Sequence, residues 1–253
     1  MVLFIGILIY DRSFLKIRLN DIWIFFGAGV FSELLLNICY NESINRLTLS
    51  LAAVLLCMAP IFVIIISALL FKEKITKAKL FCMILAITGC VLNSGVLESS
   101  SNNLSLIGII VGIASAFFYA LFSIFSRAGM NHGYNAYTIV FYSIGIFAVL
   151  LIPFTDWDIV TSYVLKAPLE NFTFLFGSAI VNSCLPYLLL TISMIYIDTG
   201  TASLLASGGE PVSASVFGML VFAEAPTIMT ISGLIITVIA LTLLCKADQR
   251  RKV

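Results

Sequence analysis

Charge is scarce in this chain. Aspartate, glutamate, lysine and arginine make up 11% of its 253 residues, and the formal net charge is +1. A chain with so little charge has no basic surface for nucleic acid, so we expect no nucleic-acid partner. Hydrophobic residues make up 61% of the chain, and its mean hydropathy is +1.12. No water-soluble fold of this length can bury that much apolar side chain, so the sequence predicts that a lipid bilayer surrounds most of it.

The residue patterns of common enzymes and metal sites are missing as well. The chain has one histidine and contains no His-Glu-x-x-His, P-loop or Gly-x-Ser-x-Gly pattern. Its six cysteines lie within or at the ends of apolar runs, at spacings that match no zinc or haem site. We therefore predict that the protein is not an enzyme and uses no catalytic residue, metal or cofactor.

Eight apolar runs are long enough to cross a bilayer, which takes about 20 residues. They cover roughly 22–40, 48–71, 78–96, 105–126, 136–154, 172–194, 201–222 and 227–245. Residues 1–10 are apolar but only half a span long, and they lack the basic segment and cleavage site of a signal peptide, so we expect them to be the end of a longer helix. The fold class that these runs predict is an all-α, multi-pass membrane protein.

The chain contains one sequence unit twice, at an offset of 151 residues. Each copy has a proline before an apolar run, then a phenylalanine, a glutamate two residues later and a threonine three residues after that. The matching pairs are Pro60 and Pro211, Phe71 and Phe222, Glu73 and Glu224, and Thr76 and Thr227. Repeats built from membrane-length apolar segments are typical of secondary transporters.

Lysine and arginine placement predicts the orientation. When the chain is threaded alternately through the spans, twelve of the fourteen basic residues fall on one side, which the positive-inside rule makes cytoplasmic, together with the C-terminus. Only Arg46 and Lys166 fall on the other side. The first copy of the repeat continues after Glu73 as a basic segment on the inside, whereas the second copy lies outside and has none. An odd number of spans in each repeat produces this inversion.

The offset also predicts the size of the parent fold. Residues 105–154 hold two spans that precede the third span of the second repeat. Subtracting 151 places residue 105 at −46, so the opening helix of the first repeat would lie upstream of Met1, and residues 1–10 would be the surviving half of its second helix. We therefore expect a parent with inverted repeats of five helices each, ten in all, of which about eight and a half are present. The predicted division is 1–97 for a first repeat shortened at its N-terminus, and 98–253 for the second repeat with a basic cytoplasmic tail.

With its paired proline and glutamate motifs, the chain resembles the EamA-type transporters of the drug/metabolite transporter superfamily. The resemblance also covers the Gly89 and Gly233 helices and the run Ser115–Arg127. It implies a multi-pass carrier of the bacterial inner (plasma) membrane that moves small organic metabolites, commonly outward. It does not identify the substrate, because members of the family carry amino acids, sugars, nucleotide derivatives and drugs.

Glu210 is the leading candidate for the transport site. It lies mid-span among Gly208, Gly209 and Pro211, where the glycines loosen the helix and the proline removes a backbone donor. We predict a broken helix here, as in transporters that bind substrate at the bilayer midplane. Pro60 is the corresponding hinge in the first repeat. The alternative is a kink that only improves helix packing.

Other polar residues within spans complete the predicted substrate or proton pathway. Glu33 lies mid-span, with Asn37 one turn further along the same face, and an ionisable group at that depth normally faces a cavity or a partner. Asn182 and Tyr187 form a second polar patch, and Tyr119 is expected to supply an aromatic wall. For Glu33 the alternative is a protonated carboxyl bonded to a neighbouring helix.

Glu73 and Glu224 are interpreted differently, as structural residues. Each lies in a short turn before a helix, where a carboxylate favours the positive end of the helix dipole and the nearby threonine caps the helix. Arg127, at a cytoplasmic helix end, is expected to extend its side chain toward the aqueous interface.

Together these features predict a secondary transporter that works by alternating access, with Glu33 and Glu210 binding a proton or a cationic group of the substrate. The alternative is a truncated, non-transporting or vestigial membrane subunit. The bilayer and a small-molecule substrate are the expected partners, and the sequence does not determine the oligomeric state.

The predicted topology is testable with reporter fusions. A reporter after Val253 and one inserted at Lys74 should both report the cytoplasm, while one at Ser100 should report the outside, because the basic residues divide twelve to two. A cytoplasmic signal at Ser100 would contradict the threading of the spans.

Overall fold

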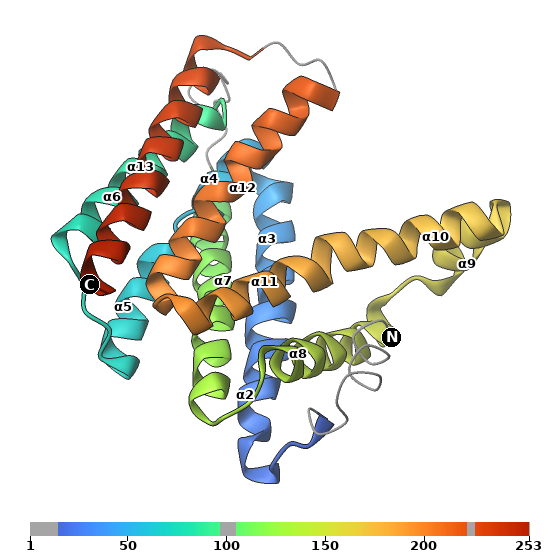
Figure 1. Ribbon diagram of the computed structural model, residues 1–253. Helices are drawn as coiled ribbons and strands as arrows, with labels where there is room; N and C mark the ends of the chain where they lie inside the picture. Colours follow the sequence, from blue (N-terminus) through green and yellow to red (C-terminus); the bar gives the residue numbers. More distant parts are fainter. Residues whose placement is uncertain (1–14, 97–104, 222–225, 253) are drawn as a thin grey trace.

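The computed structural model describes residues 15–96, 105–221 and 226–252 (Figure 1). Within these ranges every regular element is helical, as the sequence predicts, and Phe222 and Glu224 of the second repeat motif lie outside them. The helices are η2 (Leu19–Asp21), α2 (Ile22–Phe26), η3 (Gly27–Leu34), α3 (Leu35–Arg46), α4 (Leu49–Leu56), α5 (Ala59–Phe71), α6 (Lys77–Asn93), α7 (Leu106–Asn131), α8 (Ala136–Leu151), η4 (Ile152–Phe154), α9 (Trp157–Lys166), α10 (Pro168–Ala179), η5 (Ile180–Cys184), α11 (Leu185–Tyr196), α12 (Thr199–Val221) and α13 (Ile228–Lys252).

Seven helical segments of the described chain are long and apolar enough to cross a membrane. They are Leu19–Arg46, Leu49–Phe71, Leu106–Asn131, Ala136–Phe154, Pro168–Tyr196, Thr199–Val221 and Ile228–Ala247. The eighth predicted span, 78–96, corresponds to α6, which has 17 residues and is about 25 Å long. It ends at Asn93 because Gly95 adopts a left-handed conformation with φ of 69°, a common helix terminator.

The most extensive helix pair is formed by α6 and α13, which lie side by side and run in opposite directions (Figure 1). Two glycines let them approach closely. A Cβ atom on Gly233 would lie 2.5 Å from the amide nitrogen of Asn93 and 2.6 Å from the carbonyl oxygen of Gly89. One on Gly89 would clash with the side chain of Thr237. Small residues that allow two backbones to meet are typical of membrane helix interfaces.

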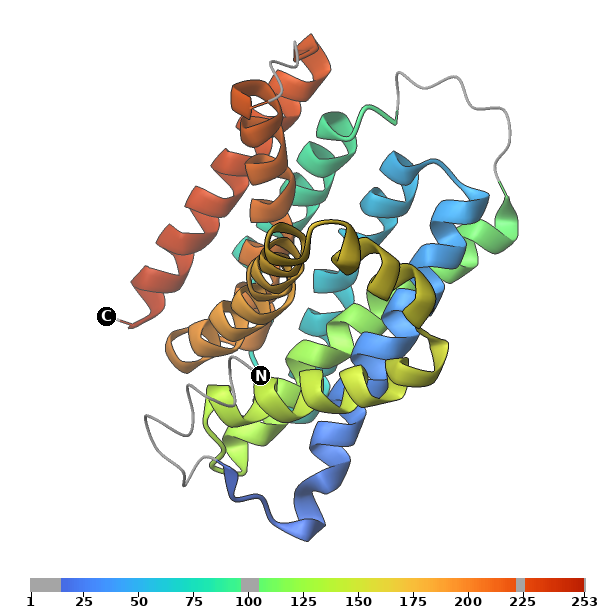
Figure 2. The same cartoon turned by 90° about the vertical axis from the view of Figure 1, so that its right-hand side faces the viewer.

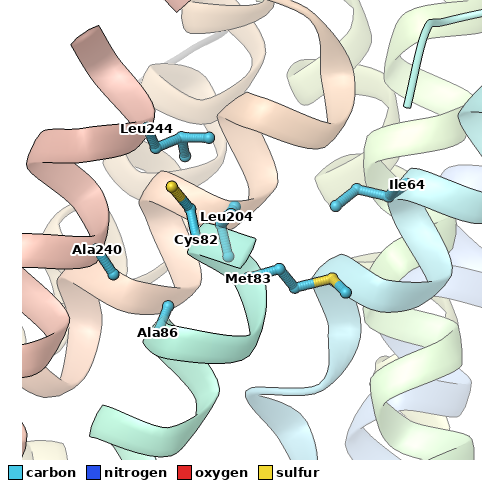
Figure 3. Close-up of a cluster of buried hydrophobic side chains, with 7 residues drawn as sticks. All are labelled: Ile64, Cys82, Met83, Ala86, Leu204, Ala240 and Leu244. Carbon is cyan, nitrogen blue, oxygen red and sulfur yellow. The ribbon is translucent and has the colours of Figure 1, made fainter. Parts of the chain in front are cut away.

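The same pair can be compared with the predicted internal repeat. Gly89 and Thr237 form a close pair. Adding 151 to Gly89 gives Ala240, and subtracting 151 from Thr237 gives Ala86. Ala86 and Ala240 belong to one buried cluster, with Cys82 and Leu244 beside them (Figure 3). An interface in which equivalent residues meet twice, between antiparallel helices, fits the predicted inverted repeat.

The long spans Leu19–Arg46 and Pro168–Tyr196 share a second repeated feature. Each contains wide π-helical turns, at η3 and η5, and adding 151 to residues 29–33 gives 180–184, the range of η5. Their surroundings differ. The first span has 44% of its most apolar stretch buried, because its α3 and η3 pack on α7 and α8 (Figure 2). The second span has only 11% of its most apolar stretch buried.

The close approach of α6 and α13 generates a prediction. Replacing Gly233 by Leu should lower the yield of folded protein and its melting temperature in detergent, because overpacking at a tight contact typically costs about 1–3 kcal/mol. Gly145→Leu is the matched control, since a Cβ atom at Gly145 would have no described neighbour within 4 Å. Equal melting temperatures for the two variants would show that the glycines are not needed for this packing.

Candidate functional site

A cavity of about 580 Å³ lies between α3, α4, α6, α7 and α12. One wall is a single face of α4 and the turn after it, formed by Ser50, Ala53, Val54 and Cys57. These residues recur at intervals of three, four and seven, so they lie on one side of the helix. The wall runs from mid-membrane to the end of α4 that the basic residues predict to be outside.

The opposite wall is the second half of α12. Its lining residues are Ser207, Glu210, Pro211, Ala214 and Ser215, again at helical spacing. The structure therefore brings Glu210 and Pro211 into one cavity, as the sequence suggested, with the Glu210 side chain exposed in it. Toward the predicted cytoplasmic end, α5 and α12 pack instead through buried side chains such as Ile64 and Leu204 (Figure 3).

The predicted break in the helix at Glu210 is wrong. Helix α12 continues from Thr199 to Val221, through Gly208, Gly209 and Pro211. The broken span belongs to the first repeat, where a turn at Cys57 and Met58 separates α4 from α5 and Pro60 occupies the first turn of α5. Proline fits a helix start because no amide donor is needed there, whereas Pro211 interrupts one hydrogen bond without ending its helix.

Asn93, near the end of α6, is a site residue that the sequence analysis missed. Its Nδ2 donates a hydrogen bond to the Pro211 carbonyl oxygen at 3.1 Å, and its Oδ1 accepts one from Ser215 Oγ at 2.9 Å. Asn93 thus holds α12 on the cavity side where proline weakens the helix. A polar amide within an apolar run was the available signal.

Glu210 is the only Asp, Glu, Lys, Arg or His among the described lining residues. Two tyrosines, Tyr40 from α3 and Tyr119 from α7, line the same cavity, and both interact electrostatically with its carboxyl. Cys57 and Cys90 face each other closely enough for their thiols to interact. The site therefore presents one acidic group, aromatic rings and hydroxyls.

Glu33 lies behind this cavity and is not part of its lining. It belongs to η3, is 3% exposed, and within the described chain its Oε1 has no hydrogen-bond partner. Its carboxyl interacts with the Tyr187 hydroxyl on α11, and Tyr187 in turn interacts with Tyr119. Glu33, Tyr187, Tyr119 and Glu210 are thus close enough to interact electrostatically, from the protein interior to the cavity.

Two other predicted pathway residues do not line the cavity. The Asn37 side chain is exposed and donates to the Glu33 carbonyl oxygen of its own helix at 2.8 Å. Asn182 is exposed on η5. Their proposed part in transport stays a prediction, and neither adds a polar group to the cavity described here.

Glu73 caps a helix, but not the one expected. Thr76 caps the following helix α6 by accepting from the Lys79 amide at 3.2 Å. The Glu73 carboxylate instead accepts hydrogen bonds at the start of α12, from the Thr199 amide at 3.0 Å, the Thr199 hydroxyl at 2.7 Å and the Gly200 amide at 3.4 Å. The turn that carries it starts at Lys72, which adopts a left-handed conformation.

Arg127 completes this contact rather than extending toward the aqueous interface. Its guanidinium donates to the Met194 carbonyl oxygen at 2.8 Å and lies 3.5 Å from Glu73 Oε1. We name Glu73, Arg127, Thr199 and Gly200 the Glu73 clamp. It joins the turn after α5 to α7, α11 and α12 at the end of the protein that the basic residues predict to be cytoplasmic.

A second ion pair reinforces the start of α12. Lys79 on α6 pairs with Asp198, whose carboxylate also accepts from the Thr201 amide and hydroxyl, each at 2.9 Å. Burial alone would raise the pKa of Asp198, but the Lys79 ammonium and the Thr201 hydrogen bonds hold that pKa below its usual value. Asp198 therefore stays ionised at physiological pH and keeps α12 tied to α6.

Seven apolar helical segments of membrane length in the described chain define a multi-pass membrane protein, and a cavity lined by a carboxylate among such helices is typical of carriers. The sequence profile of the EamA-like transporter family matches residues 1–95 and 106–245. The chain belongs to this family.

Individual relatives agree with the family assignment. The chain is 28% identical over 224 residues to the pseudopaline exporter CntI of Pseudomonas aeruginosa PAO1, covering 88% of this chain and 74% of that protein. It is 27% identical over 207 residues to an uncharacterised transporter of Archaeoglobus fulgidus, covering 82% and 70%. One crystal structure aligns with a TM-score of 0.76 at 15% identity, covering 100% of this chain and 85% of that one, which supports the fold.

The side to which the cavity opens is testable with the native cysteines. A membrane-impermeant maleimide added outside intact cells should modify Cys57, which lines the cavity, at least tenfold faster than Cys82, which is buried in the cytoplasmic half of α6 at 2% exposure. Mass spectrometry of the labelled peptides separates the two sites. Faster labelling of Cys57 from the cytoplasmic side of inverted vesicles would contradict the orientation.

Proposed function

We propose that this protein is a secondary transporter that moves small organic molecules across the bacterial inner membrane by alternating access, in the outward direction. The observation that carries the proposal is the cavity between α3, α4, α6, α7 and α12, which Glu210 lines, together with the packed and clamped opposite end of α12. Its volume of about 580 Å³ lies in the range of small-molecule sites. The exporter among its relatives supports transport and the outward direction.

The chemistry of the cavity favours cationic substrates. An anion would meet the Glu210 carboxylate without a described lining cation to balance it, whereas an ammonium group pairs with the carboxylate and lies between Tyr40 and Tyr119. Aromatic rings attract organic cations, by about 0.5–2 kcal/mol for each contact. The apolar face of α4, with Ala53 and Val54, suits the hydrocarbon part of such a molecule.

Glu210 and Glu33 are the proposed sites of proton coupling. A carboxyl inside a membrane protein binds a proton or a cation readily because an unpaired negative charge is costly there. A cation that enters the cavity competes with the proton on Glu210, and the polar chain through Tyr119 and Tyr187 offers Glu33 as a second acceptor. Proton entry would then drive cation exit.

The second candidate is a non-transporting membrane subunit. The observation that favours it is the weak packing of Pro168–Tyr196, of which only 11% of the most apolar stretch is buried. Such a subunit would bind a ligand without moving it, so flux separates the two proposals.

The test uses benzyltrimethylammonium, whose charge does not change with pH, in vesicles that contain the purified protein. Vesicles preloaded with the unlabelled cation should accumulate the labelled cation, and Glu210→Gln should reduce this exchange at least tenfold because the ion pair is lost. Glu170→Gln, in the exposed first turn of α10, is the matched control and should exchange normally. In the wild type, cation affinity should rise with pH and each binding event should release a proton.

The outcomes separate the possible errors. Exchange of benzenesulfonate instead of the cation would overturn the assignment of cationic substrates. Cation binding without exchange would support the non-transporting subunit. Normal exchange by Glu210→Gln would show that this carboxyl does not hold the substrate.

A further inference from the structure

We infer that the buried interface between α5 and the first half of α12 is the cytoplasm-facing half of the transport pathway, held closed in this conformation by the Glu73 clamp. The inference rests on the proposed function, because it names the second surface that the same substrate contacts. Inverted repeats allow it to be located, since each residue of the open half has a counterpart in the other repeat.

The α4 wall of the cavity gives the first set of counterparts. Ser50 and Ala53 line the cavity and are partly exposed. Adding 151 gives Thr201 and Leu204, which are 2% and 1% exposed. The same helix face is thus open in one repeat and packed in the other.

The α12 wall gives the same result in the opposite direction. Glu210 and Ala214 line the cavity and are exposed. Subtracting 151 gives Ala59 and Val63, both 0% exposed. The span Leu49–Phe71 and helix α12 are therefore both open in their outer halves and packed in their inner halves. This is the arrangement expected of one state of a carrier whose two states exchange the roles of the repeats.

The chemistry of the closed half differs from that of the open half in one respect. Ala59 stands where the outer half has Glu210, and Val63 and Leu204 are apolar. The inner half therefore offers no carboxylate of its own, and Glu210 is the charge partner of the substrate in both states. The ligand class is the same organic cation, which keeps its ammonium group at Glu210 while its apolar body faces α5 and α12.

The Glu73 clamp is placed to control this interface. It binds the first residues of α12, directly beyond Thr201 and Leu204, and ties them to the turn after α5. Opening the inner half requires the start of α12 to move away from α5, which breaks the hydrogen bonds to Glu73. Losing the carboxylate should therefore shift the protein toward the cytoplasm-open state.

The test measures cysteine accessibility from the cytoplasmic side in inverted vesicles. Val63→Cys reports on the proposed pathway, and Ile139→Cys is the matched control, because Ile139 is also 0% exposed but lies on α8, where it packs beside Gly129 of α7. Combining Glu73→Ala with Val63→Cys should raise the rate of modification by an impermeant maleimide at least tenfold. The rate at Ile139→Cys should not change, and outside labelling of native Cys57 should fall.

Two further variants protect the test against misfolding. Thr199→Val removes one donor of the clamp at nearly constant volume and should raise the rate at Val63→Cys severalfold in the same direction. Ala59→Cys is a second reporter on the same interface. An equal rise at Val63→Cys and Ile139→Cys would indicate general loosening and overturn the inference, as would unchanged labelling of Val63→Cys and Ala59→Cys in both clamp variants.

The binding and exchange of benzyltrimethylammonium are measured on the same variants. Exchange by the wild type together with inaccessible Val63→Cys and Ala59→Cys would keep the proposed function and reject this pathway. Accessible reporters in a protein that does not exchange the cation would support the second conformation and reject the proposed substrate.

Discussion

The start of α12 imposes the constraint on which the rest of the site depends. The first amide groups of any helix lack partners within the helix, and inside a membrane protein water does not replace them. Glu73 and Asp198 satisfy the amides of Thr199, Gly200 and Thr201 from outside the helix. Because Glu73 belongs to the first repeat, this local requirement joins the repeats at one end and leaves the cavity at the other.

The charged side chains also differ between the clamped end and the cavity. The partly or fully buried cations, Lys79 and Arg127, lie next to carboxylates at the clamped end. Glu210 lies in the cavity without a described cation in the lining. A carboxylate in a largely apolar cavity without a neighbouring cation favours a proton or a cationic ligand, which is the basis of the site proposed at Glu210.

The sequence predicted those features that depend on composition and periodicity. The helical fold, the spans and the two-copy motif follow from apolar runs of membrane length and from a constant offset, and Glu210 stood out as an acid in such a run. The sequence did not identify contacts between residues that are distant in the chain. Glu73 lies 126 residues from Thr199, and nothing near either residue identifies the other. A helix break was predicted at Pro60 and at Pro211 but forms only before Pro60, because glycine and proline permit a break, whereas packing decides whether one forms.

Asn93 illustrates a further limit of sequence reasoning. The Asn93 side chain matters because it forms hydrogen bonds with both Pro211 and Ser215 on another helix, α12. A polar residue in an apolar run signals that some partner exists, but only the packing of α6 against α12 identifies it. The same is true of Tyr40, whose contact with the cavity depends on how α3 lies beside α4.

The π-helical turns at η3 and η5 carry a consequence for the history of the chain. A π turn arises when one extra residue is accommodated within an α-helix. The spans that contain the two turns start 149 residues apart, at Leu19 and Pro168, and end 150 apart, at Arg46 and Tyr196. The second span is therefore one residue longer than the first, 29 residues against 28. A π turn at corresponding positions of both spans is the pattern expected if a single ancestral repeat carried the insertion before it was duplicated.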